Sequence, residues 1–312
     1  MPWPKSCRAL ESDDRTEIDP SIHCPVLVTA VVEWLRPAAG GEILDATVGL
    51  GGHAEALLAA GADRLVGLDR DPDALALARA RLNRFGDRVR LRHGDFRSLR
   101  AELDALGIAA VRGIVLDLGL SSYQIERAGR GFSFLRDEPL DMRFDPTQGL
   151  TAREWLARVP LYELERALAE YGDEPSARRI ARALVAARER TPLATTGQLV
   201  EIVKRAVPRR RWPRRLHIAT RTFQAIRIAV NHELSALAEA LPQAAESLAP
   251  GGRLVVIAFH SVEDRVVKET FRRLAVTGRY RILTRKPVTP NPTETAENPR
   301  ARSAKLRVLE RP

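Results

Sequence analysis

The 312-residue sequence lacks the features of a membrane or secreted protein. Its best uninterrupted apolar run, Leu254–Phe259, has the length of a strand, whereas a membrane helix needs about 20 residues. The first residues, Met1–Lys5, contain no apolar stretch of the kind that a secretory signal requires. The two cysteines, Cys7 and Cys24, are too few for a disulfide framework or a zinc site. We therefore expect a soluble, cytoplasmic protein without a bound metal.

Lysine is also scarce. Only five of the 50 basic residues are lysine and the rest are arginine, and against 40 acidic residues the net charge is +10. A basic excess of this size predicts a polyanionic partner. A GC-rich genome would produce the same arginine excess, however, so the placement of the arginines is more informative than their number.

Short apolar runs alternate with helical patterns over the first 120 residues. The sequence predicts strands at 42–46, 64–68, 89–92 and 113–116, and helices at 26–35, 53–60, 72–84 and 98–106. Alternation with short connections is typical of a parallel sheet with helices on both faces. With 45% hydrophobic residues the chain can form a substantial core. The predicted fold class is therefore α/β, with a doubly wound sheet.

The alternation is interrupted after Ser122 and resumes near Arg253. Helices are predicted at 152–158, 161–170, 174–189 and 196–206, followed by one long helix at 222–248. A strand at 253–259, a helix at 263–274, a strand near 280–284, a loop at 287–299 and a strand at 305–309 complete the chain. We expect a flexible extension (1–22), a core (23–129 and 217–312) and a helical insertion for substrate recognition (130–216).

A glycine-rich loop follows the first predicted strand, from Asp45 to His53, and includes Gly51 and Gly52. In doubly wound folds this edge of the sheet carries the ligand crevice, and glycines there let the backbone approach a ligand. Asp69, at the end of the second strand, can accept both hydroxyls of a ribose, and Phe96, after the third, can flank an adenine. The alternatives are that the glycine-rich loop is only a tight turn, that Asp69 caps the next helix and that Phe96 belongs to the core. Three strand ends in register favour a nucleoside-type ligand.

The residues favour S-adenosylmethionine (SAM) over NAD. A dinucleotide site would have G-x-G-x-x-G, and here the third position is Ala54, which the pattern sometimes allows. Asp45 stands just before the turn, where a carboxylate would repel a pyrophosphate and attract the sulfonium and ammonium groups of SAM. An NAD-linked oxidoreductase on the same sheet remains the alternative.

Several long motifs closely resemble the RsmH (MraW) family. They are His23–Leu27, Asp45–His53, Leu116–Ser122, Gly131–Phe134, Pro139–Arg143, Thr220–Arg227, Asn231–Leu234, Phe259–Asp264 and Asn298–Arg307. The resemblance implies a SAM-dependent methyltransferase of class I fold with a helical insertion, acting on N4 of a cytidine in the decoding region of small-subunit (16S) ribosomal RNA. The SAM site that it implies consists of Gly51, Gly52, His53, Asp69, Phe96, Asp117 and Gln124.

Cytosine N4 is a weak nucleophile, because its lone pair is delocalised into the ring. An acceptor for an N–H of this amine would help, and Asp117 or the backbone carbonyls of 118–120 are candidates for that role. The alternative is that Asp117 only binds SAM. His260 and Ser261 follow the fifth strand and are predicted to act catalytically on the substrate side. Glu263 and Asp264 equally suit a helix N-terminus.

A basic run at 204–215 lies at the junction of insertion and core. We expect RNA contact by Arg209, Arg210, Arg211, Trp212, Arg214 and Arg215. A solvated charged face is the alternative explanation. A third functional interpretation is a non-catalytic RNA-binding assembly factor. The sequence leaves open whether naked 16S RNA or the small ribosomal subunit is the substrate, and whether the chain is a homodimer.

Overall fold

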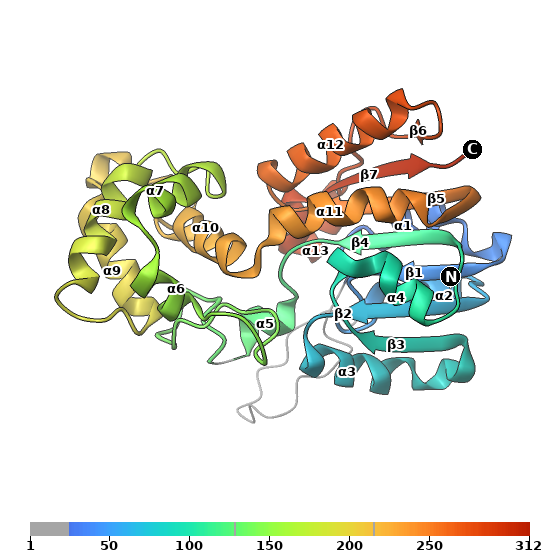
Figure 1. Ribbon diagram of the computed structural model, residues 1–312, viewed down its shortest axis with the longest axis horizontal. Coiled ribbons are helices and arrows are strands. Elements are labelled where there is room, and N and C mark those ends of the chain that lie inside the picture. Colours follow the sequence, from blue (N-terminus) through green and yellow to red (C-terminus); the bar gives the residue numbers. More distant parts are fainter. Residues whose placement is uncertain (1–24, 128, 215) are drawn as a thin grey trace. The chain divides into compact units, whose positions relative to one another are not determined.

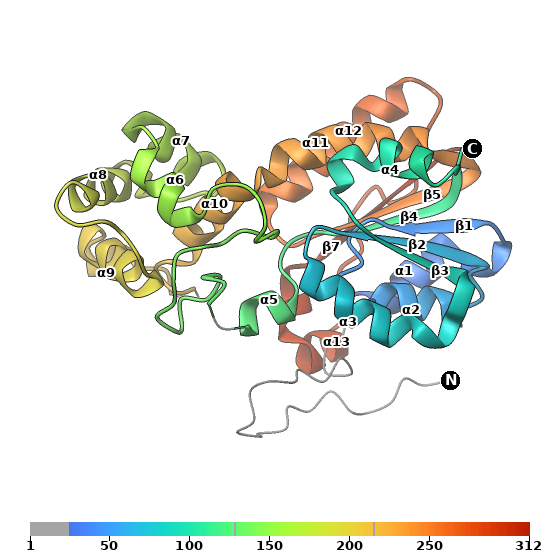
Figure 2. The same cartoon turned by 60° about the horizontal axis from the view of Figure 1, so that its bottom comes forward.

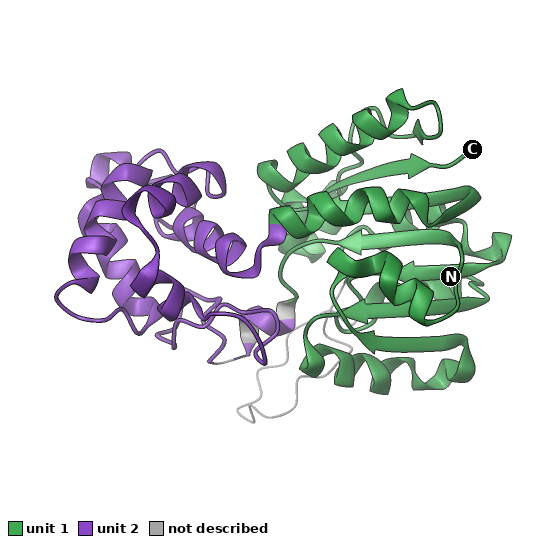
Figure 3. Ribbon diagram, in the orientation of Figure 1, with its two compact units in different colours: residues 1–121, 234–312 green, residues 122–233 purple. Residues whose placement is uncertain are grey.

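A computed structural model describes residues 25–127, 129–214 and 216–312, so the predicted extension at 1–22 lies outside the described residues. The chain divides into two compact units (Figure 3). We call residues up to Ser121 together with Leu234–Pro312 the sheet unit, and Ser122–Glu233 the helical unit. The helical unit contains the whole of the expected insertion, 130–216, and extends beyond it at both ends.

The sheet unit is built on a seven-stranded sheet in the order β3-β2-β1-β4-β5-β7-β6 (Figure 1). The strands are β1 (Glu42–Asp45), β2 (Arg64–Asp69), β3 (Val89–His93), β4 (Val111–Asp117), β5 (Leu248–Ala258), β6 (Arg281–Ile282) and β7 (Lys305–Glu310). The first five are parallel, and β7 pairs antiparallel with both β5 and β6.

Helices cover both faces of this sheet, as the doubly wound prediction requires (Figure 2). One face packs on α1 (Val28–Leu35), α2 (Gly52–Ala59) and α3 (Pro72–Leu82), and the other on α4 (Leu99–Ala105), α11 (Glu233–Glu246) and α12 (Ser261–Val276). Neighbouring strand residues point to opposite faces, so Ile43 belongs to the first core and Leu44 to the second. The predicted fold class is confirmed.

The strand order creates a switch point between β1 and β4. The chain moves outward from β1 through β2 to β3, then returns to place β4 on the other side of β1. The two crossover connections therefore leave in opposite directions at the carboxyl ends of β1 and β4, which is where doubly wound folds bind their ligands. Asp45 and Asp117 are the last residues of these two strands.

The helical unit contains α5 (Ser122–Glu126), α6 (Ala152–Arg158), α7 (Leu161–Glu170), α8 (Ala177–Arg188), α9 (Thr196–Ala206) and α10 (Thr220–Asn231). The bounds of α6, α7 and α9 are those predicted from the sequence. Two helices begin with complete capping boxes, Thr151 with Glu154 and Thr195 with Gln198. These local signals explain why the boundaries could be predicted.

The prediction of one long helix at 222–248 is wrong. The chain forms two helices there, because α10 ends at Asn231, His232 has a left-handed backbone (φ 53°), and α11 starts at the next residue. The side chain of Asn231 explains the break, because it accepts the amide of Phe144 at 2.7 Å and donates to the carbonyl of Met142 at 2.7 Å. The apolar pattern continues across the break, so periodicity alone could not reveal it.

The loop predicted at 287–299 is also wrong in part, since it contains α13 (Pro292–Glu297) and leads into the 3-10 turn η6 (Pro299–Ser303). Asn291 caps α13 by accepting the amide of Glu294 at 2.8 Å. Further 3-10 turns are η2 (Pro37–Ala39), η3 (Asn83–Arg88), η4 (Phe96–Ser98) and η5 (Arg209–Arg211). Within the described ranges, no helix is long and apolar enough to cross a membrane.

Candidate cofactor and substrate site

Three carboxylates end neighbouring parallel strands in the sheet unit: Asp69 on β2, Asp45 on β1 and Asp117 on β4. Thr47 connects two of them. Its amide donates to Asp45 Oδ1 at 3.2 Å, and its hydroxyl accepts the amide of Asp117 at 2.7 Å. The structure therefore brings the predicted acidic residues together at the switch point.

The glycine-rich loop is held down on β2 by its backbone. The amide of Gly49 donates to Asp69 Oδ2 at 2.7 Å, and the amide of Val48 donates to the carbonyl of Leu68 at 2.8 Å. Gly51 has φ +83°, a conformation that favours glycine. A Cβ on Gly52 would lie only 2.8 Å from Pro25 Cγ. The loop therefore needs glycine for conformation at one position and for space at the next.

His53 follows this loop in the first turn of α2 and is buried. Its Nε2 lies 3.3 Å from Asp117 Oδ2. Asp117 Oδ1 and Asp45 Oδ2 are buried oxygens without a hydrogen-bond partner among the described residues. Buried polar atoms are rarely left without partners, so these two oxygens fit a polar ligand bound between them.

Burial and mutual proximity shift the pKa values of this cluster. Burial raises the pKa of Asp45 to about 7, against the opposing charge of His53, and burial raises the pKa of Asp69 to about 6. Burial lowers the pKa of His53, but Asp117 and Asp45 outweigh it and the net shift is upward. A cationic ligand would relieve the cost of keeping these carboxylates ionised, whereas a pyrophosphate would increase it.

The other predicted cofactor residues have structural partners of their own. Asp69 accepts the amides of Gly49 and Asp71, so part of its hydrogen-bonding capacity holds the loop. Phe96 opens η4 and packs, partly buried, against the core. Gln124 is buried in α5 of the helical unit. Cofactor contacts by these three residues stay predictions.

His260 and Ser261 lie at the start of α12, directly after β5. His260 is the N-cap: Nδ1 accepts the amide of Glu263 at 3.3 Å, and Nε2 lies 3.1 Å from Glu263 Oε1. Glu263 in turn accepts the amide of Phe259 at 2.8 Å. The ring therefore has a structural reason to be here, and catalytic roles for His260 and the exposed Ser261 stay predictions.

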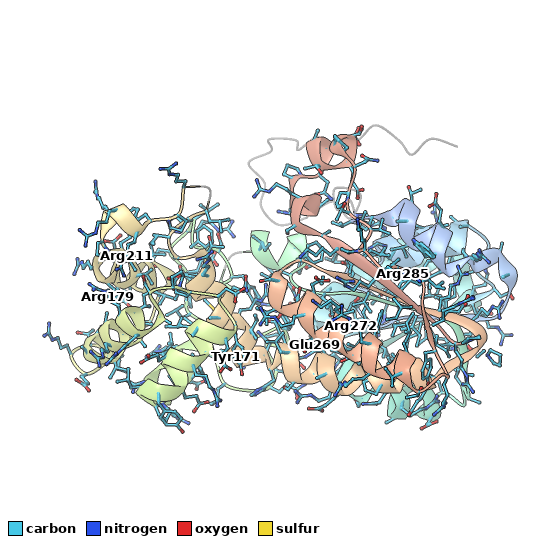
Figure 4. The ribbon with its side chains drawn as sticks, turned by 90° about the horizontal axis from the view of Figure 1, so that it is seen from above. Tyr171, Arg179, Arg211, Glu269, Arg272 and Arg285 are labelled. Atoms are coloured by element: carbon cyan, nitrogen blue, oxygen red, sulfur yellow. The ribbon has the colours of Figure 1, made fainter. Side chains whose placement is uncertain are left out.

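The basic run begins in the last turn of α9 and continues through η5. Among its exposed arginines are Arg209, Arg210, Arg211 and Arg214 (Arg211 is labelled in Figure 4), and Arg215 lies outside the described residues. No ion pair joins these four to the rest of the described chain. Trp212 is half-buried and donates Nε1–H to the carbonyl of Val207 at 2.9 Å. The guanidinium carbon of Arg209 lies 5.8 Å from the centroid of its ring. The arginines are thus available to an anion, while Trp212 is held by its own loop.

Sequence reasoning missed Glu294, which α13 brings to the sheet-unit site. Its Oε1 accepts the amide of Leu27 at 2.6 Å, and its charge contributes to the raised pKa of His53. The signal was present in Asn291 as an N-cap, Pro292 at the first helical position and Glu294 two residues later. Searched over the described residues, the chain has no group of three His, Cys, Asp or Glu side chains that could hold a metal ion.

Comparison with known proteins decides the family. The family model described as "MraW methylase family" matches residues 20–312. The chain belongs to this family. The ribosomal RNA small subunit methyltransferase H of Pelobacter propionicus is 49% identical over 307 residues, covering 93% of this chain and 98% of that protein. The protein of the same name from Anaeromyxobacter dehalogenans is 50% identical over 304 residues, covering 93% and 97%.

Membership of the MraW methylase family agrees with the resemblance that the motifs show. The predicted methyltransferase class is confirmed, and neither the oxidoreductase nor the non-catalytic factor finds support among these relatives. Among solved structures, an rRNA methylase from Streptococcus thermophilus aligns with 92% of this chain and 97% of its own. Its TM-score of 0.44 and identity of 11% are too low to add to the assignment.

Proposed function

We propose that the chain transfers a methyl group from SAM to N4 of a cytidine in the decoding region of small-subunit (16S) ribosomal RNA. The observation that carries the proposal is the buried acidic cluster at the switch point, where Asp45 Oδ2 and Asp117 Oδ1 have no partner among the described residues. The names of the relatives supply the substrate class, and the motif resemblance supplies the position of the methyl group.

The residues of the sheet unit fit SAM by their chemistry. Asp45 and Asp117 would face its positively charged groups, because their buried oxygens, Asp45 Oδ2 and Asp117 Oδ1, favour a cation nearby. The backbone of Gly51 and Gly52 would allow close approach, and Asp69 and Phe96 would hold the ribose and the adenine. When bound, SAM supplies a methyl group on sulfonium, which is a good leaving group.

Asp117 is the residue that we assign to the reacting amine. Its Oδ1 can accept an N–H of cytosine N4, and this hydrogen bond helps to localise the nitrogen lone pair. After methyl transfer the same oxygen receives the proton of the amine. Asp117 Oδ2 lies 3.3 Å from His53 Nε2, so a protonated histidine would pair with the carboxylate. Positioning matters more than basicity for this reaction. His260 and Ser261 are proposed to contact the substrate side.

The basic run is proposed to bind the RNA. Arg209, Arg210, Arg211 and Arg214 are exposed and have no acidic partner among the described residues, which suits phosphate contacts. Arg215 and Trp212 complete the predicted contact set. The target base must be single-stranded or flipped out to reach a buried carboxylate. Because the proposed substrate is ribosomal, we also propose that the protein is cytoplasmic.

The direct test is to map the methyl group. Small ribosomal subunits from a strain that lacks the gene would be incubated with the purified protein and methyl-labelled SAM, and the labelled nucleoside identified by mass spectrometry. We expect N4-methylated cytidine at one decoding-region position. A Gly52→Val variant serves as the inactive control, because its side chain would collide with Pro25. Label on another base, on a ring carbon or on protein would overturn the proposal.

A further inference from the structure

A second basic feature of the helical unit lies apart from the basic run. A cavity of about 240 Å³ opens beside α6 and the end of α8. Its lining is Arg153, Glu154, Ala157, Arg158, Arg188, Pro192 and Leu193. Three of these seven residues are arginines and one is acidic, so the cavity has an excess of positive charge.

Glu154, the acidic residue of the lining, is engaged in the capping box of α6. Its carboxylate accepts the amide and the hydroxyl of Thr151 at 2.9 and 2.8 Å as part of the capping box of α6. These hydrogen bonds and, to a smaller extent, the charge of Arg158 lower the pKa of Glu154, so its single negative charge offsets only one of the three arginines. The side chains of Arg153 and Arg158 are exposed and make no ion pair within the described part of the chain.

Arg188 is fixed in position at the edge of the cavity. Its Nη1 donates to the carbonyls of Leu156 and Val159 at 2.6 and 2.7 Å, at the carboxyl end of α6. These two bonds use one nitrogen of the guanidinium, and among the described residues its Nε and Nη2 have no partner. A guanidinium held this way is preorganised to bind a phosphate through its remaining donors.

We propose that this cavity binds one phosphate and its ribose from the substrate RNA, as a second contact apart from the basic run. The proposal rests on the proposed function for its substrate. The volume lies below the roughly 300–1,000 Å³ of pockets for drug-sized ligands, which suits one backbone unit. The exposed Ala157 and Pro192 offer apolar surface to the sugar, and the arginines offer donors to the phosphate.

The two basic features lie near opposite ends of α9. Pro192 and Leu193 precede the helix, and the basic run starts in its last turn. The 11 residues of α9 span about 16 Å at about 1.5 Å per residue. An RNA strand that reaches both features would therefore be fixed at two backbone positions, which sets its direction across the helical unit.

The first test measures salt dependence. The double variant Arg153→Ser/Arg158→Ser leaves Arg188 and its helix contacts intact. The matched control is Arg179→Ser/Arg182→Ser, because both arginines are exposed on α8 and neither lines the cavity (Arg179 is labelled in Figure 4). Binding to small ribosomal subunits lacking the methyl group would be measured from low to high salt. We expect the double variant to bind several-fold more weakly and to lose about 0.7–0.9 from the log–log salt slope. An unchanged affinity and slope would overturn the proposal.

The second test identifies the occupant. A photo-cross-linking amino acid at position 157 would line the cavity, and the same group at position 179 would be its control. Cross-links from position 157 to one rRNA segment, absent from position 179, support the proposal, and cross-links to a ribosomal protein overturn it. Methyl transfer by the wild-type protein tests the proposed function separately. Transfer without cavity cross-links would leave that function standing and reject the cavity as an RNA contact.

Discussion

The carboxylate of Glu294 accepts the backbone amide of Leu27 at 2.6 Å, joining residues that are 267 positions apart. Leu27 is the N-cap of α1, has a left-handed backbone (φ 54°) and has no side chain that could cap the helix. Pro25, in the same turn, packs against Gly52 of the glycine-rich loop. One carboxylate from the C-terminal part of the chain thus supports the turn on which the cofactor loop rests.

We therefore expect Glu294→Ala to weaken SAM binding without removing any proposed SAM contact. A hydrogen bond to a charged group contributes about 1.5–3 kcal/mol, and if part of this reaches the loop the Kd for SAM rises several-fold. Glu294→Gln should recover much of the affinity, because its amide oxygen can still accept from Leu27. Calorimetric titration with SAM measures both effects.

The control is Glu297→Ala, since Glu297 is exposed on the same helix. If Glu294→Ala and Glu297→Ala had equal SAM affinity and equal Tm, the support role of Glu294 would be rejected.

The acidic cluster predicts a pH dependence centred on Asp45. Its pKa is 3.8 in an exposed reference state and about 7 in the fold, so folding takes up a proton. The contribution of this proton to the free energy of unfolding is fully present below pH 3.8 and is lost as the pH rises through about 7. Asp45→Asn should therefore raise the Tm of the cofactor-free protein by several degrees at pH 8 and by less at pH 5.

The affinity for SAM should rise with pH, whereas the stability of the cofactor-free protein falls. As the pH rises from 6 to 8, Asp45 ionises and Asp69 completes its ionisation, so the site becomes more negative and attracts the cation more strongly. We expect the Kd for SAM to fall with pH in the wild type and to vary much less in Asp45→Asn. Asp87→Asn, an exposed site in the same unit, serves as control. A wild-type Kd that stays flat from pH 6 to 8 would contradict this account.

The proposed role of Asp117 can be separated from simple cofactor binding. Asp117→Asn keeps the shape of the side chain but removes its charge and its capacity to take a proton. If Asp117 serves the amine, kcat should fall at least 100-fold while the Kd for SAM changes by less than tenfold. The measurements are single-turnover methyl transfer to methyl-deficient subunits and calorimetric SAM titration. A loss of SAM affinity that accounts for the whole loss of activity would reject the amine role.

The fold was predictable because its signals are local. Apolar runs ending in Asp45, Asp69 and Asp117 marked three strands and placed three carboxylates at one edge of the sheet. The capping box at Thr151 fixed the start of α6 to the residue. In each case the residues that carry the signal are neighbours in the chain.

The features that sequence reasoning missed depend on distant partners. The break at His232 follows from Asn231 reaching Met142 and Phe144, 89 and 87 positions away. Glu294 enters the site through a contact with Leu27. A local pattern signals the helix that carries Glu294, through Asn291 and Pro292, but not its contact with Leu27. At 222–248 tertiary contacts overrode the continuous apolar periodicity.

His260 offers a case in which local geometry and catalysis make different predictions. Its ring caps α12 and both ring nitrogens face Glu263. Asparagine is a good N-cap, so His260→Asn should keep the Tm near the wild-type value, whereas His260→Ala should cost about 1 kcal/mol of stability. If the ring acts on the substrate side as proposed, His260→Asn should be stable and bind SAM but lose turnover. Turnover within a few-fold of the wild type would instead reduce the role of His260 to capping α12.

The last prediction concerns the basic run. Arg209, Arg210 and Arg211 are exposed, lie outside any long helix and have no acidic partner among the described residues. Replacing all three with serine removes up to three phosphate contacts, each of which contributes about 0.7–0.9 to the log–log slope of RNA affinity against salt. We expect the slope to fall by about two and the affinity at low salt to drop at least tenfold, while SAM affinity stays unchanged. Replacing Arg178, Arg179 and Arg182 on α8 with serine is the matched control for total charge, and equal losses from the two triple variants would show that net charge, rather than the basic run, binds the RNA.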